Sequence, residues 1–448
     1  MSDLLATGAS GVRAYQSALT TVSENIANAG TAGYARRTVS LREVNAGAGI
    51  ASASNVVSGM GVVVDGVVRS ADAFRAADVR TSSADLAKSE TGIAWLDRIQ
   101  TALTGNQLGD RLTSFFTSAQ AIGADPTASA PRSVFLEAGT SAANAFAATG
   151  RALDQVAADL DGTAKNAVTT LNSLGTALAK VNDGLGRATP GSGNAAQLLD
   201  QRDQLLEQMS AITDVSVSID VAGRAAVRVG GSTGPMFVAG SDTGTVSFAR
   251  GENGAVSFAV NRAGEVATLV PSGGALAGIV DGAQRIAAAR EQLNGIATSF
   301  VDGVNAVQAQ GRNLDGNPGA AMFAAGDSPT DIDMMLTDPR GIAAASVGAG
   351  TRDNSNLQAL TALRGSGGFE AKTTGLISGN AAALASRQQV AEAQSAIRDG
   401  AVAARDAVSG VNLDSEAVDL MRFQQAYQAS SRVIQVARET LQSILDIR

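Results

Sequence analysis

The chain has 448 residues, 45% hydrophobic, 17% charged and only 4% aromatic, so it is long enough for two to four domains with buried cores. It contains neither cysteine nor histidine, which excludes disulfides, thiolate metal sites and the commonest general base, and leaves an enzyme only a narrow chemistry. The net charge of −8, without basic runs, disfavours nucleic acid and anionic membranes as partners.

The first segment, residues 3–28, has the apolar spacing of a helix and ends in a turn-forming run from Asn28 to Gly33. It carries an early acidic residue and no continuous apolar core. We therefore expect no cleavable secretory signal, and no stretch of the chain is apolar enough to cross a bilayer. Residues 34–71 change character, because two β-branched runs flank a loop of small residues. They predict two strands or an extended arm.

The pattern is helical over residues 72–212, with three turns rich in glycine, proline and asparagine. The longest helix is expected over residues 131–185, with a break near Gly162. After a later proline-containing stretch, helical periodicity returns near Asp353 and again from about residue 379 to the end.

Between the helical segments the hydrophobic period shifts from 3.6 to 2, which predicts a small all-β insertion over residues 213–271. Helices resume near Gly274. Because helices precede and follow the insertion, residues 72–212 and 272–410 are expected to form one discontinuous helical domain. The fold class predicted from the residues is therefore mainly α with a small β domain.

Both ends of the chain carry rows of residues spaced seven apart, the pattern of a coiled-coil seam. The N-terminal rows contain Leu5, Val12, Leu19 and Ile26, and, three residues later each time, Tyr15 and Val22. The C-terminal rows contain Leu413, Leu420, Tyr427, Ile434 and Leu441, and Phe423, Ala437 and Ile444. Glu416 and Ser430 interrupt the C-terminal seam, which favours helices that pack fully only among neighbours. The alternative is that each helix docks on its own domain.

Two terminal segments resemble a known family. Residues 25–34, which include Asn25, Asn28, Gly33 and Tyr34, resemble the N-terminal signature shared by bacterial flagellar rod, hook and hook-associated proteins. Residues 411–434, with the core Arg-Phe-Gln-Gln-Ala-Tyr-Gln-Ala, resemble the end of the first hook-associated proteins, the hook–filament junction family. The two asparagines could simply cap a helix, but the resemblance implies a role in axial packing.

The resemblance implies an inner coiled-coil domain of residues 1–33 and 411–448, a connecting arm of residues 34–71, the helical middle domain and an outer β domain. It implies a structural subunit, not an enzyme, that is exported by the type III route and forms a ring in the extracellular flagellum. The implied partners are like subunits, the hook protein, the second hook-associated protein and a cytosolic export chaperone on the C-terminal helix. No cofactor, metal, nucleic acid or membrane is expected.

Several motifs resemble catalytic or metal sites without their full chemistry. Gly230–Gly234 matches G-x-S-x-G in a chain without histidine, and Gly191–Ala196 matches a dinucleotide motif without a preceding strand. Asn313–Asn317 lacks the glycine and glutamate of a calcium loop. We interpret all three as turns. The charged helix face of Asp200, Arg202 and Asp203 is expected to form solvated or intersubunit ion pairs.

Other functions stay open from the sequence alone. The chain could be another flagellar axial protein, such as the hook protein or the second junction protein, although the C-terminal core argues against both. A secreted enzyme with an Asp/Glu site and a secreted helical effector are alternatives of different classes.

Overall fold

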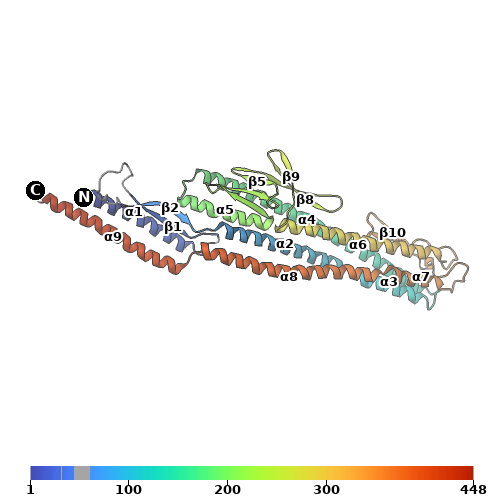
Figure 1. Ribbon diagram of the computed structural model, residues 1–448. Helices are drawn as coiled ribbons and strands as arrows, with labels where there is room; N and C mark the ends of the chain where they lie inside the picture. Colours follow the sequence, from blue (N-terminus) through green and yellow to red (C-terminus); the bar gives the residue numbers. More distant parts are fainter. Residues whose placement is uncertain (1, 32, 45–60, 447–448) are drawn as a thin grey trace.

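The computed structural model describes residues 2–31, 33–44 and 61–446, so the loop expected within the arm lies outside the described residues. The molecule is elongated (Figure 1). At one end α1 (Ser2–Ala27) and α9 (Leu413–Asp446) lie side by side, with both ends of the chain at their outer tips. We call these two helices the terminal pair. Beside α1, β1 (Arg37–Glu43) pairs antiparallel with β2 (Val62–Arg69), as the β-branched runs predicted.

The rest of the chain, elements α2 to α8, forms a long helical body in which α2 packs against α8 and α6. Its helices are α2 (Ala73–Thr104), α3 (Leu108–Ile122), α4 (Ser129–Arg187), α5 (Gly193–Ile212), α6 (Gly274–Gln310), α7 (Ser355–Gly367) and α8 (Phe369–Ser409).

Two helix boundaries differ from the sequence-based expectation. The predicted break at Gly162 is wrong, because α4 runs through that position without interruption. A glycine inside a helix costs only about 1 kcal/mol, and the long buried face of α4 offsets that cost. The helix expected from residue 379 begins earlier, at Phe369, which is fully buried.

Aromatic residues are few, but they converge in the body. The ring of Phe300 lies 5.2 Å from Phe115, 5.3 Å from Phe323 and 5.6 Å from Phe369, measured between centroids. All four side chains are almost completely buried. Because they come from α3, α6, α8 and a loop strand, this cluster joins segments that are far apart in the sequence.

The β-rich segment forms two antiparallel sheets beside α4. Their strands are β3 (Val215–Ile219), β4 (Ala225–Val229), β5 (Met236–Ala239) and β6 (Asp242–Thr243), and β7 (Thr245–Arg250), β8 (Val256–Arg262) and β9 (Glu265–Leu269). The chain enters and leaves the segment at one point, where the Asp214 carboxylate accepts hydrogen bonds from the backbone of Ser272 and Gly273. The mainly α fold with a β insertion is therefore confirmed.

Four asparagines on helices hold neighbouring extended segments in the same way. Each amide oxygen accepts a hydrogen bond from a backbone N–H, and each amide nitrogen donates to the carbonyl of the same residue, so that the side chain acts as a short strand partner. The pairs are Asn25 with Arg37, Asn172 with Val246, Asn182 with Ala225 and Asn305 with Phe323.

The motifs that resembled catalytic sites are turns and caps, as expected. Residues 230–234 join β4 to β5, and the Ser192 hydroxyl accepts from the Ala195 N–H at the start of α5. The Asn313 side chain closes a turn onto Asn317, before β10 (Phe323–Ala325) and β11 (Ile332–Met334). Within the described ranges no helix could span a membrane, and no group of three or more carboxylates is placed to hold a metal.

Candidate functional site at the base of the terminal pair

The two terminal helices approach closely where two glycines of α1 face α9. A β-carbon at Gly8 would lie 2.7 Å from Ile434, and one at Gly11 would lie 2.7 Å from the Ser430 hydroxyl. Tyr15 and Phe423 lie ring to ring at 6.4 Å. Because the two helices lie so close together, the side chains in the predicted seam need not all be large to make contact.

The predicted seam residues are not equally placed. Val22 and Ala437 are buried, and the partly buried ones are Leu5, Val12, Tyr15, Leu19, Leu420, Phe423, Tyr427 and Ile434. Exposed ones are Ile26, Leu413, Leu441 and Ile444. The buried face of α1 is therefore rotated away from its largest hydrophobic row and toward Ala14, Ala18 and Asn25.

The side of α9 that points away from α1 carries apolar side chains exposed to solvent, interspersed with polar ones such as Gln425 and Arg432. Val418, Met421 and Val436 are 59%, 56% and 60% exposed. Positions 418 and 436 are eighteen residues apart, which places them on the same side of the helix after five turns. A helix that is apolar beyond its paired face is typical of a contact surface for further helices.

Asn25 is the centre of the polar contacts at the base of the pair, and it is completely buried. Its amide nitrogen donates to the Arg37 carbonyl and to Glu416 Oε2 at 2.8 and 2.9 Å. Its amide oxygen accepts from the Arg37 N–H and from the Tyr34 hydroxyl. All four of its hydrogen-bonding positions are used, so this side chain joins α1, β1 and α9.

Glu416 and Arg36 complete this contact, and sequence analysis assigned no role to either. Glu416 is 1% exposed and accepts from Arg36 Nε at 2.6 Å, while Arg36 also reaches Asp419. The only signal in the sequence was an acidic residue at an inward position of the C-terminal seam. A buried carboxylate there requires a cation from another segment, because an unpaired buried charge is costly.

The two predicted residues in the turn after α1, Asn28 and Gly33, have different roles. Asn28 bonds only locally, to the Glu24 carbonyl and to Thr31, so it caps the helix. Gly33 has a φ of +76° and lies against Gln204, where a β-carbon would come within 2.5 Å of the glutamine side chain. The positive φ therefore favours glycine here, and a larger residue would also displace the Gln204 side chain.

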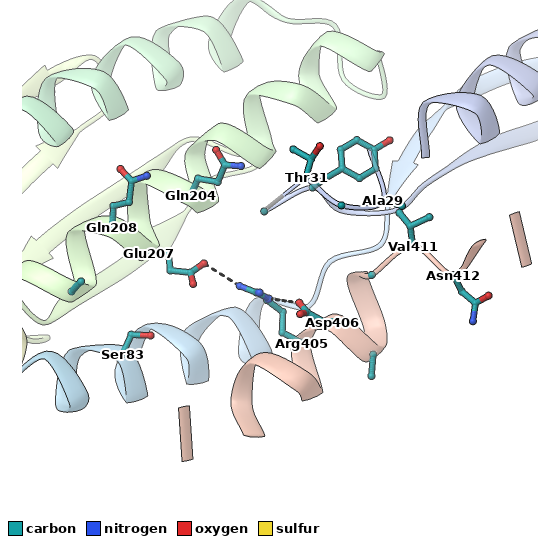
Figure 2. A pocket seen from close by; sticks show the side chains of 16 residues that line it. Ala29, Thr31, Ser83, Gln204, Glu207, Gln208, Arg405, Asp406, Val411 and Asn412 are labelled. Atoms are coloured by element: carbon teal, nitrogen blue, oxygen red, sulfur yellow. Dashed lines mark hydrogen bonds and ion pairs between the residues drawn. The ribbon is translucent and has the colours of Figure 1, made fainter. Parts of the chain in front are cut away.

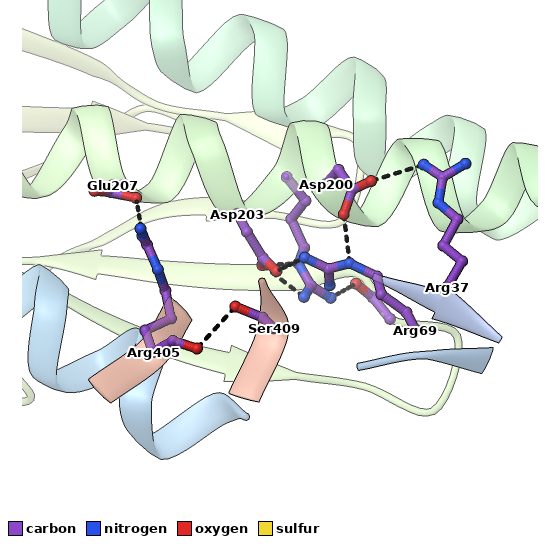
Figure 3. Close-up of polar contacts among 9 residues, drawn as sticks. Arg37, Arg69, Asp200, Asp203, Glu207, Arg405 and Ser409 are labelled. Carbon is purple, nitrogen blue, oxygen red and sulfur yellow. Dashed lines mark hydrogen bonds and ion pairs between the residues drawn. The ribbon is translucent and has the colours of Figure 1, made fainter. Parts of the chain in front are cut away.

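The base of the terminal pair is fastened to the body by arginines (Figure 3). Asp200 on α5 accepts from Arg37 at 2.7 Å and from Arg69 at 2.5 Å, and Arg69 also reaches Asp203. Arg202 donates to Asp203 as well. The expectation of solvated or intersubunit pairs for Asp200, Arg202 and Asp203 was wrong, because Asp200 and Arg202 are buried and these contacts lie within one chain. We call Asn25, Arg36, Arg37, Arg69, Asp200, Asp203 and Glu416 the junction network.

A cleft opens beside this network, between the turn after α1, the face of α5 and the end of α8 (Figure 2). It has a volume of about 1130 Å3, and Thr31, Gln204, Arg405 and Asn412 are among the residues that line it. Burial raises the pKa of Tyr34, at the edge of the cleft, above its ordinary value of 10.0, and the Arg37 guanidinium opposes this shift. The tyrosine therefore keeps its proton at neutral pH and remains a donor to Asn25. Arginine-paired carboxylates and a protonated phenol hold segments together rather than transfer protons.

We compared the chain with known protein families. A family model described as the flagellar hook-associated protein FlgK helical domain matches residues 94–323, just over half of the chain. The chain belongs to the FlgK family. A second model, described as the flagellar basal body rod FlgEFG protein C-terminal, matches residues 405–447, which contain α9 and Glu416. These matches confirm the resemblance that the terminal motifs indicated.

Individual relatives match shorter parts of the chain. Flagellar hook-associated protein 1 of Salmonella typhimurium is 32% identical over 170 residues, which cover 38% of this chain and 29% of that protein. The protein of the same name from Escherichia coli K12 is 32% identical over 130 residues, covering 27% and 24%. The match thus spans less than a third of the length of these relatives.

A solved structure shares the fold. The flagellar hook junction protein FlgK from Burkholderia pseudomallei superposes with a TM-score of 0.50 at 22% identity, covering 56% of this chain and 47% of that one. At this identity the similarity supports the fold alone.

Proposed function

We propose that this chain is a structural subunit of the bacterial flagellum, with no enzymatic activity, that assembles as a ring at the junction between hook and filament. The observation that carries the proposal is the terminal pair of a FlgK family member with a second, exposed apolar face on α9. A single copy leaves that face in water, and neighbouring helices would bury it.

The finer assignments rest on the resemblance of the terminal segments to flagellar axial proteins. Like subunits, the hook protein and the second hook-associated protein are the partners that cover the terminal pair after assembly. Before assembly, a cytosolic chaperone covers the exposed face of α9, and the chain leaves the cell by the type III route. The terminal pair forms the inner domain, the arm connects it to the helical middle domain, and residues 213–271 form the outer β domain.

Deleting the gene tests the function. We expect cells that keep their hooks but lose their filaments, because filament subunits no longer have a junction on which to assemble. Electron micrographs of sheared flagella and a motility assay measure this outcome, and complementation with the intact chain should restore both. Loss of the hooks themselves would favour the hook protein. Unchanged motility with a lost host phenotype would favour a secreted effector, and this result would refute the proposal.

A further inference from the structure

The terminal pair and its arm meet the body at a joint that only two stretches of backbone cross among the described residues. One stretch follows β2, at residues 70–72, and the other joins α8 to α9, at residues 410–412. Neither stretch is helical or paired as a strand. Two short irregular segments of backbone do not by themselves fix the angle between the terminal pair and the helical body.

Apolar packing at the joint is sparse. The cleft of about 1130 Å3 lies on one side of the turn after α1, and a second hollow of about 650 Å3 lies on its other side, between Glu24, Asn28 and α5. A region with few buried apolar contacts opens easily. Polar contacts must therefore supply most of the restraint on the direction of the terminal pair.

Arg36 lies where these polar contacts converge. Its backbone N–H donates to the Ser409 carbonyl at the end of α8, and its carbonyl accepts from the Ser70 N–H at the end of β2, both at 2.8 Å. Arg36 thus bonds to both stretches of backbone that cross the joint. In addition to these two backbone bonds, its side chain donates to Glu416 on α9.

Glu416 in turn contacts α1 through Asn25, at 2.9 Å. Arg37, the next residue after Arg36, continues to Asp200 on the body. The contacts form one uninterrupted path from the C-terminal helix, through the N-terminal helix and the arm, to α5. Its four arginines, Arg36, Arg37, Arg69 and Arg202, face four carboxylates, Asp200, Asp203, Glu416 and Asp419.

We propose that Asn25, Arg36 and Glu416 form a clamp that fixes the direction in which the terminal pair leaves the body, and that Glu416 closes it. Without the Glu416 carboxylate, Asn25 loses one acceptor and Arg36 keeps only the longer contact to Asp419, at 3.3 Å. The helices then remain folded and Arg37 and Arg69 still hold the arm to α5, but α9 is no longer fixed to the arm, so the direction in which it leaves the body varies. Subunits that meet through their terminal helices need this direction to be the same in every copy.

The absence of cysteine allows a direct test on the full chain in its monomeric form. Gln424→Cys on α9 and Lys180→Cys on α4 are exposed positions on either side of the joint, and each carries one spin label. Pulsed electron paramagnetic resonance then gives the distribution of distances between them. We expect one narrow distribution in this background and at least a doubling of its width with Glu416→Ala.

Matched controls separate the clamp from general damage. Glu439→Ala removes an exposed glutamate from the same helix and should leave the width unchanged. Asn25→Ala should broaden the distribution, whereas Asn28→Ala, which removes only local bonds, should not. The Asn25 comparison also decides the question if Glu416→Ala fails to fold.

Equal widths for Glu416→Ala and Glu439→Ala would overturn the clamp, as would a distribution that is already broad in the unaltered background. The distance distribution is measured on the monomer. The clamp can therefore be refuted while the proposed junction function stands, and the junction function can be refuted while the clamp stands.

Discussion

Replacing Asp200 with alanine is expected to lower the free energy of unfolding by about 3 kcal/mol, because two buried guanidinium groups lose the carboxylate that they share. The side chains of Arg37 and Arg69 are only 9% and 11% exposed. Arg69 keeps Asp203, but Arg37 keeps a 3.6 Å ion contact with Glu24 and its position over the Tyr34 ring. Urea denaturation followed by circular dichroism measures the loss, since urea does not screen charges.

The matched control is Asp183→Ala. Asp183 pairs with Arg187 four residues later on α4, and both side chains are largely exposed, at 49% and 76%. Its removal is expected to cost about 0.5 kcal/mol or less, as for other exposed helix pairs. If the two substitutions cost the same, burial of the junction network contributes nothing, and our account of the joint is wrong.

Replacing Phe300 with alanine is expected to cost about 4 kcal/mol, because it leaves a cavity where the body helices meet. Phe300 is fully buried and its ring contacts those of Phe115, Phe146 and Phe323. The neighbouring rings come from different elements, so they cannot all move in to fill the space. Thermal or urea unfolding of the variant measures the loss.

The matched control is Phe74→Ala, the same substitution at an exposed phenylalanine. Its side chain is 84% exposed at the start of α2, so Phe74→Ala is expected to change the free energy of unfolding by no more than about 0.5 kcal/mol. A Phe300 variant as stable as the Phe74 variant would mean that the aromatic cluster does not hold the body together.

The elements of this fold were readable because hydrophobic period is a local property. The change from period 3.6 to period 2 near residue 213 predicted the β insertion, and the return of helical spacing near Gly274 coincides with the start of α6. The two shortest strands, β5 and β6, have four and two residues and carry too little alternation to be recognised.

The side of α1 that is buried could not be predicted as well from the sequence. Hydrophobicity favoured the row of Leu5, Val12, Leu19 and Ile26, yet α9 lies closely against Gly8, which belongs to the second predicted row, and against Gly11. The facing residues of α9 decide this, because the Ile434 side chain leaves no room for a larger residue than glycine at position 8. A partner more than 400 residues away in the chain cannot be inferred from one helix alone.

The junction network was the least predictable part. Asn25 and Glu416 are 391 residues apart, and Arg37 and Asp200 are 163 apart. Charged residues are usually exposed, so Asp200 and Arg202 were expected to pair in solvent or between subunits. Only the docking of the arm against α5 shows that these charges are buried, and the sequence carries no local signal of that contact.

We expect the exposed face of α9 to join this chain to its neighbours in the assembled flagellum. Val418→Asp with Val436→Asp places two charges on that face, at positions where both side chains are already largely exposed in the monomer. Because the fold does not depend on them, circular dichroism and the urea midpoint should be unchanged. Assembly should fail, since buried carboxylates would lie between neighbouring helices.

The control is Val221→Asp with Val266→Asp, the same substitutions at exposed positions of the β-rich segment. Electron microscopy of deletion cells that carry each variant, with recovery of the protein from the culture medium to show export, measures the result. We predict filaments with the control and bare hooks with the α9 variant. Normal filaments with the α9 variant, at normal levels of exported protein, would contradict the claim.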